Sequence, residues 1–176
     1  METQQITPQN LDETRKTGYR PTVVACCVYD KKVLLLFKKE YNLWLFVQGG
    51  VDTSEELLGV LDRELKEEMG ESFLQKCGAE KIFVGEEQVE FLPEKQTGEE
   101  LTTAEGQSFK MIGKHYYFYC VPVSDDQLKL EESDFSEYYW FDSKPALILA
   151  SKIYQPGKKR ITMKAISLLK EKGLID

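Results

Sequence analysis

Apolar residues in the first third of the chain form short continuous runs of the kind that buried strands contain. Residues 21–30 (PTVVACCVYD) and 33–40 (VLLLFKKE) are two such runs, and the short polar turn between them predicts a β-hairpin. A third run at 43–48 (LWLFVQ) ends at Gly49 and Gly50, which predicts another strand followed by a turn.

The hydrophobic period changes to that of a helix between Thr53 and Met69. Leucine and methionine recur there at spacings of three and four residues, which predicts an amphipathic helix. Thr53 and Glu56 have the spacing of a capping box, so the helix is expected to begin near them. Gly70 is expected to end it.

The remainder of the chain alternates strand-like runs with polar segments. We expect strands at 81–87, 115–123 and 138–141, a mobile acidic loop at 86–106 and a helix at 160–172. This succession of strands and helices predicts a layered fold of the α/β or α+β class.

Length and composition fit one folded domain. A chain of 176 residues with 41% hydrophobic and 30% charged residues is typical of a globular domain and excludes a largely disordered protein. Residues 1–17 are polar and are predicted to form a flexible N-terminal tail, so the folded domain is expected at 18–176.

Charge and cysteine content exclude several classes of function. A formal net charge of -7 argues against a generally basic nucleic-acid-binding surface. The apolar runs, such as Val33–Phe37, are far shorter than the ~20 residues of a membrane span, and the first residues lack the apolar core of a secretory signal. Four cysteines without CxxC spacing and one histidine argue against zinc. Cys26 and Cys27 lie in an apolar run as small buried residues, which favours a reducing, cytoplasmic location.

The predicted helix carries an unusual acidic face. Glu64, Glu67 and Glu68 lie three and four residues apart near its C-terminal end, where they repel one another and the helix dipole disfavours anions. A hard divalent cation removes both penalties, because carboxylate oxygens with water and phosphate are typical Mg²⁺ ligands. The alternative interpretation of three such glutamates alone is a solvated acidic face.

The spacing of the preceding residues favours the metal-binding interpretation. Five residues separate Gly49 from Glu55, and seven more lead to Arg63-Glu64-Leu65-Lys66-Glu67-Glu68-Met69-Gly70. This resembles the Nudix signature G-x5-E-x7-R-E-U-x-E-E-x-G-U, in which U is a bulky apolar residue. The one departure is Glu71 at the last position. The resemblance implies a Nudix hydrolase with an α/β/α sandwich built on a mixed β-sheet.

Other segments narrow the resemblance within that family. Gln48-Gly49-Gly50, Gly18–Pro21, residues 112–118, and Asp134-Phe135 with Trp140 are similar to bacterial RNA 5′-pyrophosphohydrolases and plant-type diadenosine polyphosphate hydrolases. The proline that often precedes the Gln-Gly-Gly segment in those proteins is replaced here by Val47.

The resemblance implies a magnesium site, with manganese as a possible substitute. Glu67 and Glu68 are expected to bind the metal directly, and the carbonyl of Gly49 is a further candidate ligand. Glu64 is expected to act either as a metal ligand or as the general base that orients the attacking water.

Two more acidic positions and one arginine complete the expected catalytic site. Arg63 and Glu55 are expected to form an ion pair that holds the loop against the helix and positions Glu64. Asp134 is a candidate extra carboxylate from a distant loop, and Glu137 is its rival.

Substrate contacts are expected from cations and aromatic rings outside the signature. Arg20, Lys38 and Lys158 are candidate phosphate contacts, and Tyr41 and Tyr154 are candidates to stack on a base. The alternative for Lys38 is a solvated strand end, and that for the tyrosines is packing.

The acidic segment 86–106 bears on the choice of substrate because it contains seven glutamates. Since RNA affinity depends on neutralising phosphates, this segment favours a small nucleotide such as diadenosine tetraphosphate over the 5′ end of a triphosphorylated RNA. The expected enzyme is a monomeric pyrophosphohydrolase with no membrane partner. Two rival hypotheses are a catalytically silent nucleotide-binding module and an acidic scaffold without a nucleotide site.

Overall fold

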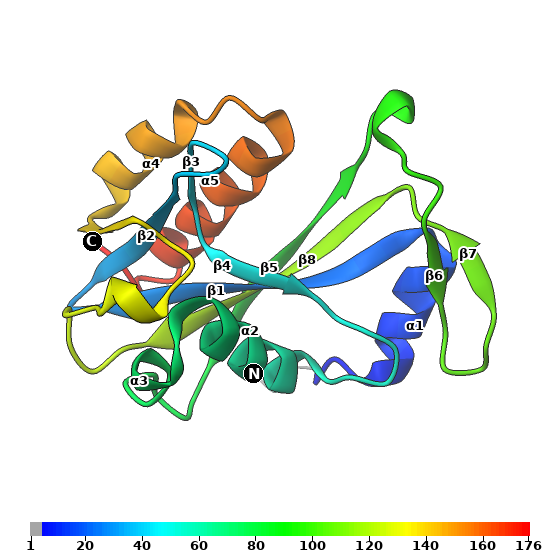
Figure 1. Ribbon diagram of the computed structural model, residues 1–176, viewed down its shortest axis with the longest axis horizontal. Helices are drawn as coiled ribbons and strands as arrows, with labels where there is room; N and C mark the ends of the chain where they lie inside the picture. The colour runs from blue at the N-terminus through cyan, green and yellow to red at the C-terminus, as the bar shows by residue number, and fades with distance from the viewer. Residues whose placement is uncertain (1–4) are drawn as a thin grey trace.

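The computed structural model describes residues 5–176. Its main sheet has seven strands and is mixed, and the prediction of a mixed sheet is confirmed. Its central order is β3-β2-β1-β8-β5, with β4 paired to β1 and β9 paired to β2, and only β1 and β8 run parallel (Figure 1). The strands are β1 (Tyr19–Tyr29), β2 (Lys32–Lys38), β3 (Leu43–Leu45), β4 (Val47–Gly50), β5 (Ile82–Glu90), β6 (Glu100–Thr102), β7 (Ser108–Lys110), β8 (Gly113–Pro122) and β9 (Glu137–Phe141).

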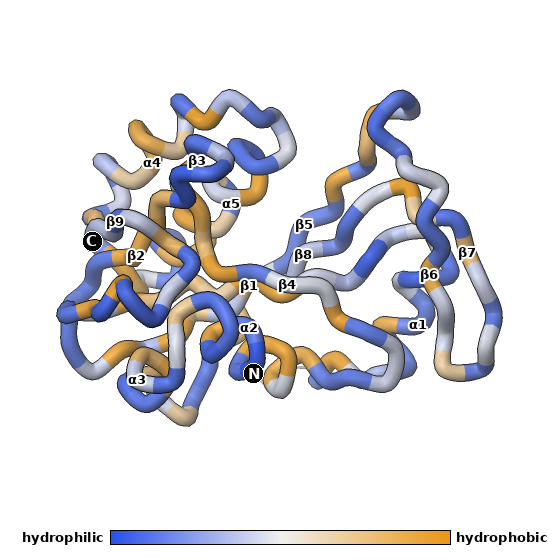
Figure 2. The backbone as a smooth tube through the Cα atoms, in the orientation of Figure 1, coloured by the Kyte–Doolittle hydropathy of each residue, from blue (hydrophilic) through white to orange (hydrophobic). Residues whose placement is uncertain are grey.

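Helices cover both faces of the sheet, which confirms the α/β/α sandwich. The α-helices are α1 (Pro8–Lys16), α2 (Leu57–Met69), α3 (Glu71–Leu74), α4 (Ser143–Ser151) and α5 (Pro156–Glu171), and two 3-10 turns lie at Pro93–Lys95 and Leu130–Glu132. In Figure 1, α2 packs below β1 and β4, whereas α4 and α5 lie above the sheet against β2, β5 and β8. Figure 2 shows hydrophobic residues concentrated along the central strands and hydrophilic residues in the peripheral turns. No helix within residues 5–176 has the length and apolar character needed to cross a bilayer.

The predicted hairpin is confirmed, and the third apolar run divides into two strands. β1 and β2 pair antiparallel around a turn at Asp30 and Lys31, which both have positive φ, as expected for a tight hairpin turn. The run 43–50 is interrupted at Phe46, so β3 pairs with β2 and β4 pairs with β1. This division places Gly49 opposite Val23 in the middle of the sheet, directly beside α2.

The prediction of a flexible tail at 1–17 is wrong for residues 5–17, and residues 1–4 lie outside the described residues. Residues 8–16 form α1, which begins with a capping box made by Thr7 and Asn10. Leu11 is fully buried and Arg15 is 3% exposed, so this helix is packed onto the domain. The polar composition of this segment predicted a flexible tail. The segment is ordered because one buried leucine and one buried arginine hold the helix on the domain.

Two further boundaries differ from the prediction. The acidic segment 86–106 is structured in part, since β5 continues to Glu90 and β6 pairs with β7 in a separate two-stranded sheet. Helix α2 begins at Leu57 rather than at Thr53, and Glu56 provides no side-chain cap. The hydroxyl of Thr53 instead donates to the carbonyl of Thr102 in β6 at 2.6 Å, which joins the loop before α2 to the β6–β7 hairpin. Gly70, with φ of 91°, ends the helix as predicted.

Candidate functional site

Helix α2 presents Glu64 to the glycine strand β4. Glu64 is 9% exposed, and a methyl group added at Gly49 would overlap its carboxylate. Glycine is therefore required at position 49 for the backbone and the carboxylate to approach so closely. Burial raises the pKa of Glu64, against the lowering effect of the Arg63 charge.

Arg63 forms a cluster with the acidic residues and the loop. Its guanidinium donates to Glu64 Oε1 at 2.7 Å and to Glu55 Oε2 at 3.2 Å, so the predicted Arg63–Glu55 ion pair is confirmed. It also donates to the carbonyl of Gly50 at 3.3 Å and lies 3.5 Å from Glu67. The arginine therefore orients Glu64 from the side of the loop.

Glu68 points from the end of α2 into a cleft. Burial raises its pKa to about 7, and the nearby charge of Glu64 adds to the effect. The charge of Asp134 also acts on Glu68, and the backbone N–H of Asp134 donates to the Glu68 carbonyl at 2.9 Å. The structure thus brings Asp134 to the acidic end of α2, whereas its rival Glu137 lies in β9 opposite Phe37.

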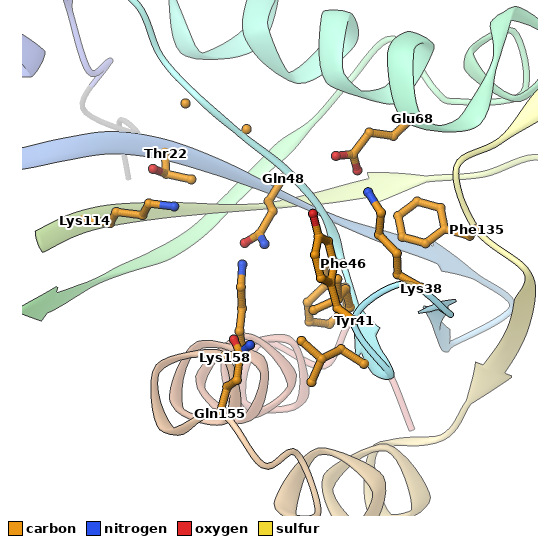
Figure 3. A pocket seen from close by; sticks show the side chains of 14 residues that line it. Thr22, Lys38, Tyr41, Phe46, Gln48, Glu68, Lys114, Phe135, Gln155 and Lys158 are labelled. Atoms are coloured by element: carbon orange, nitrogen blue, oxygen red, sulfur yellow. The ribbon is translucent and has the colours of Figure 1, made fainter. Parts of the chain in front are cut away.

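The cleft has a volume of about 330 Å³ and lies between β1, β4, the end of α2 and the start of α5 (Figure 3). Of the predicted site residues, Gly49, Glu68, Lys38, Tyr41 and Lys158 line it. Other lining residues were not predicted as site residues, among them Thr22, Phe46, Gln48, Lys114, Phe135 and Gln155. Three of these, Gln48, Lys114 and Phe135, lie in the segments that carry the family resemblance.

Lysines form the wall of the cleft that faces away from α2. Figure 3 shows Lys114 and Lys158 extending into the cleft from β8 and α5. Burial, together with the charge of Lys114, lowers the pKa of Lys158 to about 8. Burial also lowers the pKa of Lys114. Lys38 lies on the same side as Glu68, with its ammonium 5.4 Å from the ring centre of Tyr41. Partly buried cations in a concave surface favour an anionic ligand.

Two of the predicted substrate contacts lie outside the cleft lining. Tyr154 is 61% exposed, and its hydroxyl donates to the carbonyl of Tyr41 at 2.8 Å, so it supports the backbone of Tyr41. Arg20 lies at the rim, packed against Gly50, with its guanidinium 3.8 Å from Asp52 and 4.0 Å from Glu99. The contacts of Tyr154 and Arg20 with a nucleotide therefore stay predictions.

The donor chemistry of the acidic face fits a hard cation. The Glu64 side chain lies against Gly49 and its charge acts on Glu68, so a bound cation would offset the burial of these two neighbouring carboxylates. Within residues 5–176, no three His, Cys, Asp or Glu side chains converge as a complete ligand set. Glu64 and Glu67 instead turn toward Arg63. The direct metal ligands therefore stay predictions, with water and phosphate completing the set as Mg²⁺ commonly requires.

The fold and this site together define a class of α/β protein. In this class the glycine strand β4 is followed by the carboxylate-bearing helix α2, and both lie beside a cleft lined by lysines. A family model described as "NUDIX domain" matches residues 18–163, and the chain belongs to the Nudix family.

Curated relatives match a shorter region. The chain is 44% identical over 57 residues to an RNA pyrophosphohydrolase of Ruthia magnifica, covering 32% of each chain. It is 37% identical over 59 residues to an RNA pyrophosphohydrolase of Campylobacter jejuni, covering 30% of this chain and 38% of the relative. The chain spans about a third of the length of the curated relatives it matches.

Solved structures share the fold at low identity. The E. coli dihydroneopterin triphosphate pyrophosphohydrolase aligns with a TM-score of 0.58 at 16% identity, over 85% of this chain and 97% of that one. The NUDIX domain of Shewanella oneidensis NrtR, solved with ADP ribose, aligns with a TM-score of 0.54 at 16% identity, over 88% of each chain. These likenesses establish the Nudix fold of the chain.

Proposed function

We propose that this protein is a cytoplasmic, Mg²⁺-dependent Nudix pyrophosphohydrolase that acts as a monomer on nucleoside polyphosphates, preferably dinucleoside polyphosphates such as diadenosine tetraphosphate. The observation that carries the proposal is the cleft, which has the carboxylate of Glu68 on one side and the ammonium groups of Lys114 and Lys158 on the other. A polyphosphate chain complements both sides, because its oxygens suit a carboxylate-bound cation and the lysines equally.

Different residues of the site have different roles in the proposed hydrolysis. Glu64, Glu67 and Glu68 with the Gly49 carbonyl would hold the metal. When bound, Mg²⁺ supplies charge neutralisation of the phosphates and a more acidic water. Lys114 and Lys158 hold the phosphate chain, and Arg63 with Glu55 keeps Glu64 oriented, either as ligand or as general base.

RNA 5′ ends are the second candidate substrate, and the names of the curated relatives favour them. The exposed glutamates between β5 and β7 favour the smaller substrate instead. Glu99 lies 4.0 Å from Arg20 at the rim, so a chain leaving the cleft there meets negative charge. This charge repels the phosphates of an RNA beyond its first nucleotides, whereas a compact dinucleotide has no phosphates that extend so far.

A substrate panel tests the proposal directly. With Mg²⁺, kcat/KM is expected to be higher for diadenosine tetraphosphate than for 5′-triphosphorylated RNA or for mononucleotides, and chelation of the metal is expected to abolish all hydrolysis. Phosphate release measures each rate. A higher kcat/KM for RNA would select the second candidate. Nucleotide binding by calorimetry without turnover at any divalent ion would indicate a catalytically silent module.

The Lys114→Met substitution tests the lysine wall. It removes the charge and keeps a linear apolar side chain, so KM for diadenosine tetraphosphate is expected to rise about tenfold with little change in kcat, as loss of one charge-assisted contact predicts. Steady-state kinetics at fixed Mg²⁺ measure both constants. Lys110→Met is the matched control, because Lys110 is exposed on β7 and does not line the cleft. Equal KM values in the two variants would remove Lys114 from the binding site.

A further inference from the structure

Helix α1 carries a buried arginine that contacts the loop between β4 and α2. Figure 1 shows α1 beside this loop, which comprises residues 51–56. The Arg15 guanidinium donates to the carbonyls of Val51 at 2.7 Å and Asp52 at 3.0 Å, and to Asp12 Oδ1 at 2.7 Å. With 3% of its surface exposed, Arg15 exchanges water for these partners almost completely.

The contacted loop connects directly to the carboxylates of the site. The N–H of Asp52 donates to Glu55 Oε2 at 2.8 Å, and the same oxygen accepts from Arg63 at 3.2 Å. Arg63 in turn donates to Glu64 at 2.7 Å. An unbroken series of hydrogen bonds therefore joins Arg15 to Glu64.

The loop needs such external support because part of its backbone is strained. Ser54 has φ of 68°, in the left-handed region that non-glycine residues occupy only when their surroundings enforce it. Helix α1 is itself anchored on its other side, since Asp12 accepts from the N–H of Ala104 at 3.0 Å and Thr14 bonds the Tyr117 hydroxyl at 3.1 Å. Arg15 therefore holds the loop against the anchored helix α1 through its hydrogen bonds to Val51 and Asp52.

We infer that Arg15 is a positioning residue for the metal-binding carboxylates, acting through the carbonyls of Val51 and Asp52 on Glu55, Arg63 and Glu64. The inference rests on the proposed function of the site. It assigns a role in catalysis to a helix that lies outside the Nudix signature and before the matched residues 18–163.

The Arg15→Met variant tests the inference, because methionine fills the buried space and donates no hydrogen bond. Loss of a group that orients metal ligands lowers metal affinity or activity by about 10- to 100-fold. We therefore expect weaker Mn²⁺ binding to the folded, substrate-free protein by electron paramagnetic resonance, and a lower kcat with KM changed much less. Arg15→Lys retains the charge and is expected to restore part of both quantities.

The control is Lys16→Met on the same helix, since among residues 5–176 the ion-pair partner of Lys16 is the exposed Glu13. If Arg15→Met matches this control in Mn²⁺ affinity and kcat, with or without a lower melting temperature, the inference is overturned. If Arg15→Met does not fold, Arg15→Lys decides alone, and its equality with the control in both quantities overturns the inference. A wild-type protein that neither binds Mn²⁺ nor hydrolyses polyphosphates rejects the proposed function instead.

Discussion

The Glu68→Gln substitution is expected to lower kcat/KM for diadenosine tetraphosphate by on the order of 10²–10³-fold, the loss typical when one preorganised electrostatic group is removed from an active site. Glutamine has nearly the same shape and no charge, so the cleft keeps its form while the proposed cation loses a ligand. Lys38, which faces Glu68, loses its counter-charge at the same time. Phosphate release at several Mg²⁺ concentrations measures the effect.

Stability separates this effect from simple damage to the fold. Glu68 is half-buried and lies near the charges of Glu64 and Asp134, so replacing its carboxylate relieves repulsion and the variant is expected to unfold at no lower temperature than wild type. Glu71→Gln is the control, because Glu71 is an exposed glutamate that pairs with Lys66 at 2.8 Å outside the cleft. Full activity in the Glu68→Gln variant would reject the proposed mechanism.

The parts of the fold that the sequence predicts are those in which a local pattern matches the burial. The strands β1 and β2 are continuous apolar runs, and their residues between Val23 and Cys27 and between Val33 and Leu36 are almost fully buried. Helix α2 follows the helical period with buried residues on one face. Helix α1 shows no such pattern along its sequence. It is held by the burial of Leu11 and by the hydrogen bond from Arg15 to Val51, which is distant in the sequence.

The same distinction applies to the candidate site. Glu64, Glu67 and Glu68 lie on one helix at fixed spacing, so their shared face follows from the sequence alone. Lys114 lies within an aromatic strand, and only the pairing of β8 with β1 brings it to the cleft. The resemblance of residues 112–118 marks this segment, but it does not single out Lys114 as a residue of the cleft. Tyr154 shows the converse, since an aromatic ring in the expected region uses its hydroxyl on a backbone carbonyl and does not line the cleft.

The Gly49→Ala substitution is expected to lower kcat/KM for the same substrate by about 10²-fold, as a displacement of roughly 1 Å at a catalytic group predicts. The added methyl group would overlap the Glu64 carboxylate, which must then leave its present place beside β4, where it accepts from Arg63. The backbone itself tolerates alanine, because Gly49 does not adopt a positive φ. The loss therefore reports on the placement of Glu64, measured as kcat/KM together with Mn²⁺ affinity.

Gly59→Ala provides a control that has the opposite effect on stability. A methyl group at Gly59 meets no atom of residues 5–176 within 4 Å, and alanine is favoured over glycine inside a helix by about 0.5–1 kcal/mol. This variant is expected to melt at a higher temperature with unchanged kcat/KM, although it changes the same residue type in the same signature region. If Gly49→Ala retained wild-type kcat/KM and metal affinity while Gly59→Ala behaved as expected, Glu64 would not require its close contact with β4. The carboxylate beside Gly49 would then be removed from the proposed mechanism, which would have to depend on Glu67 and Glu68.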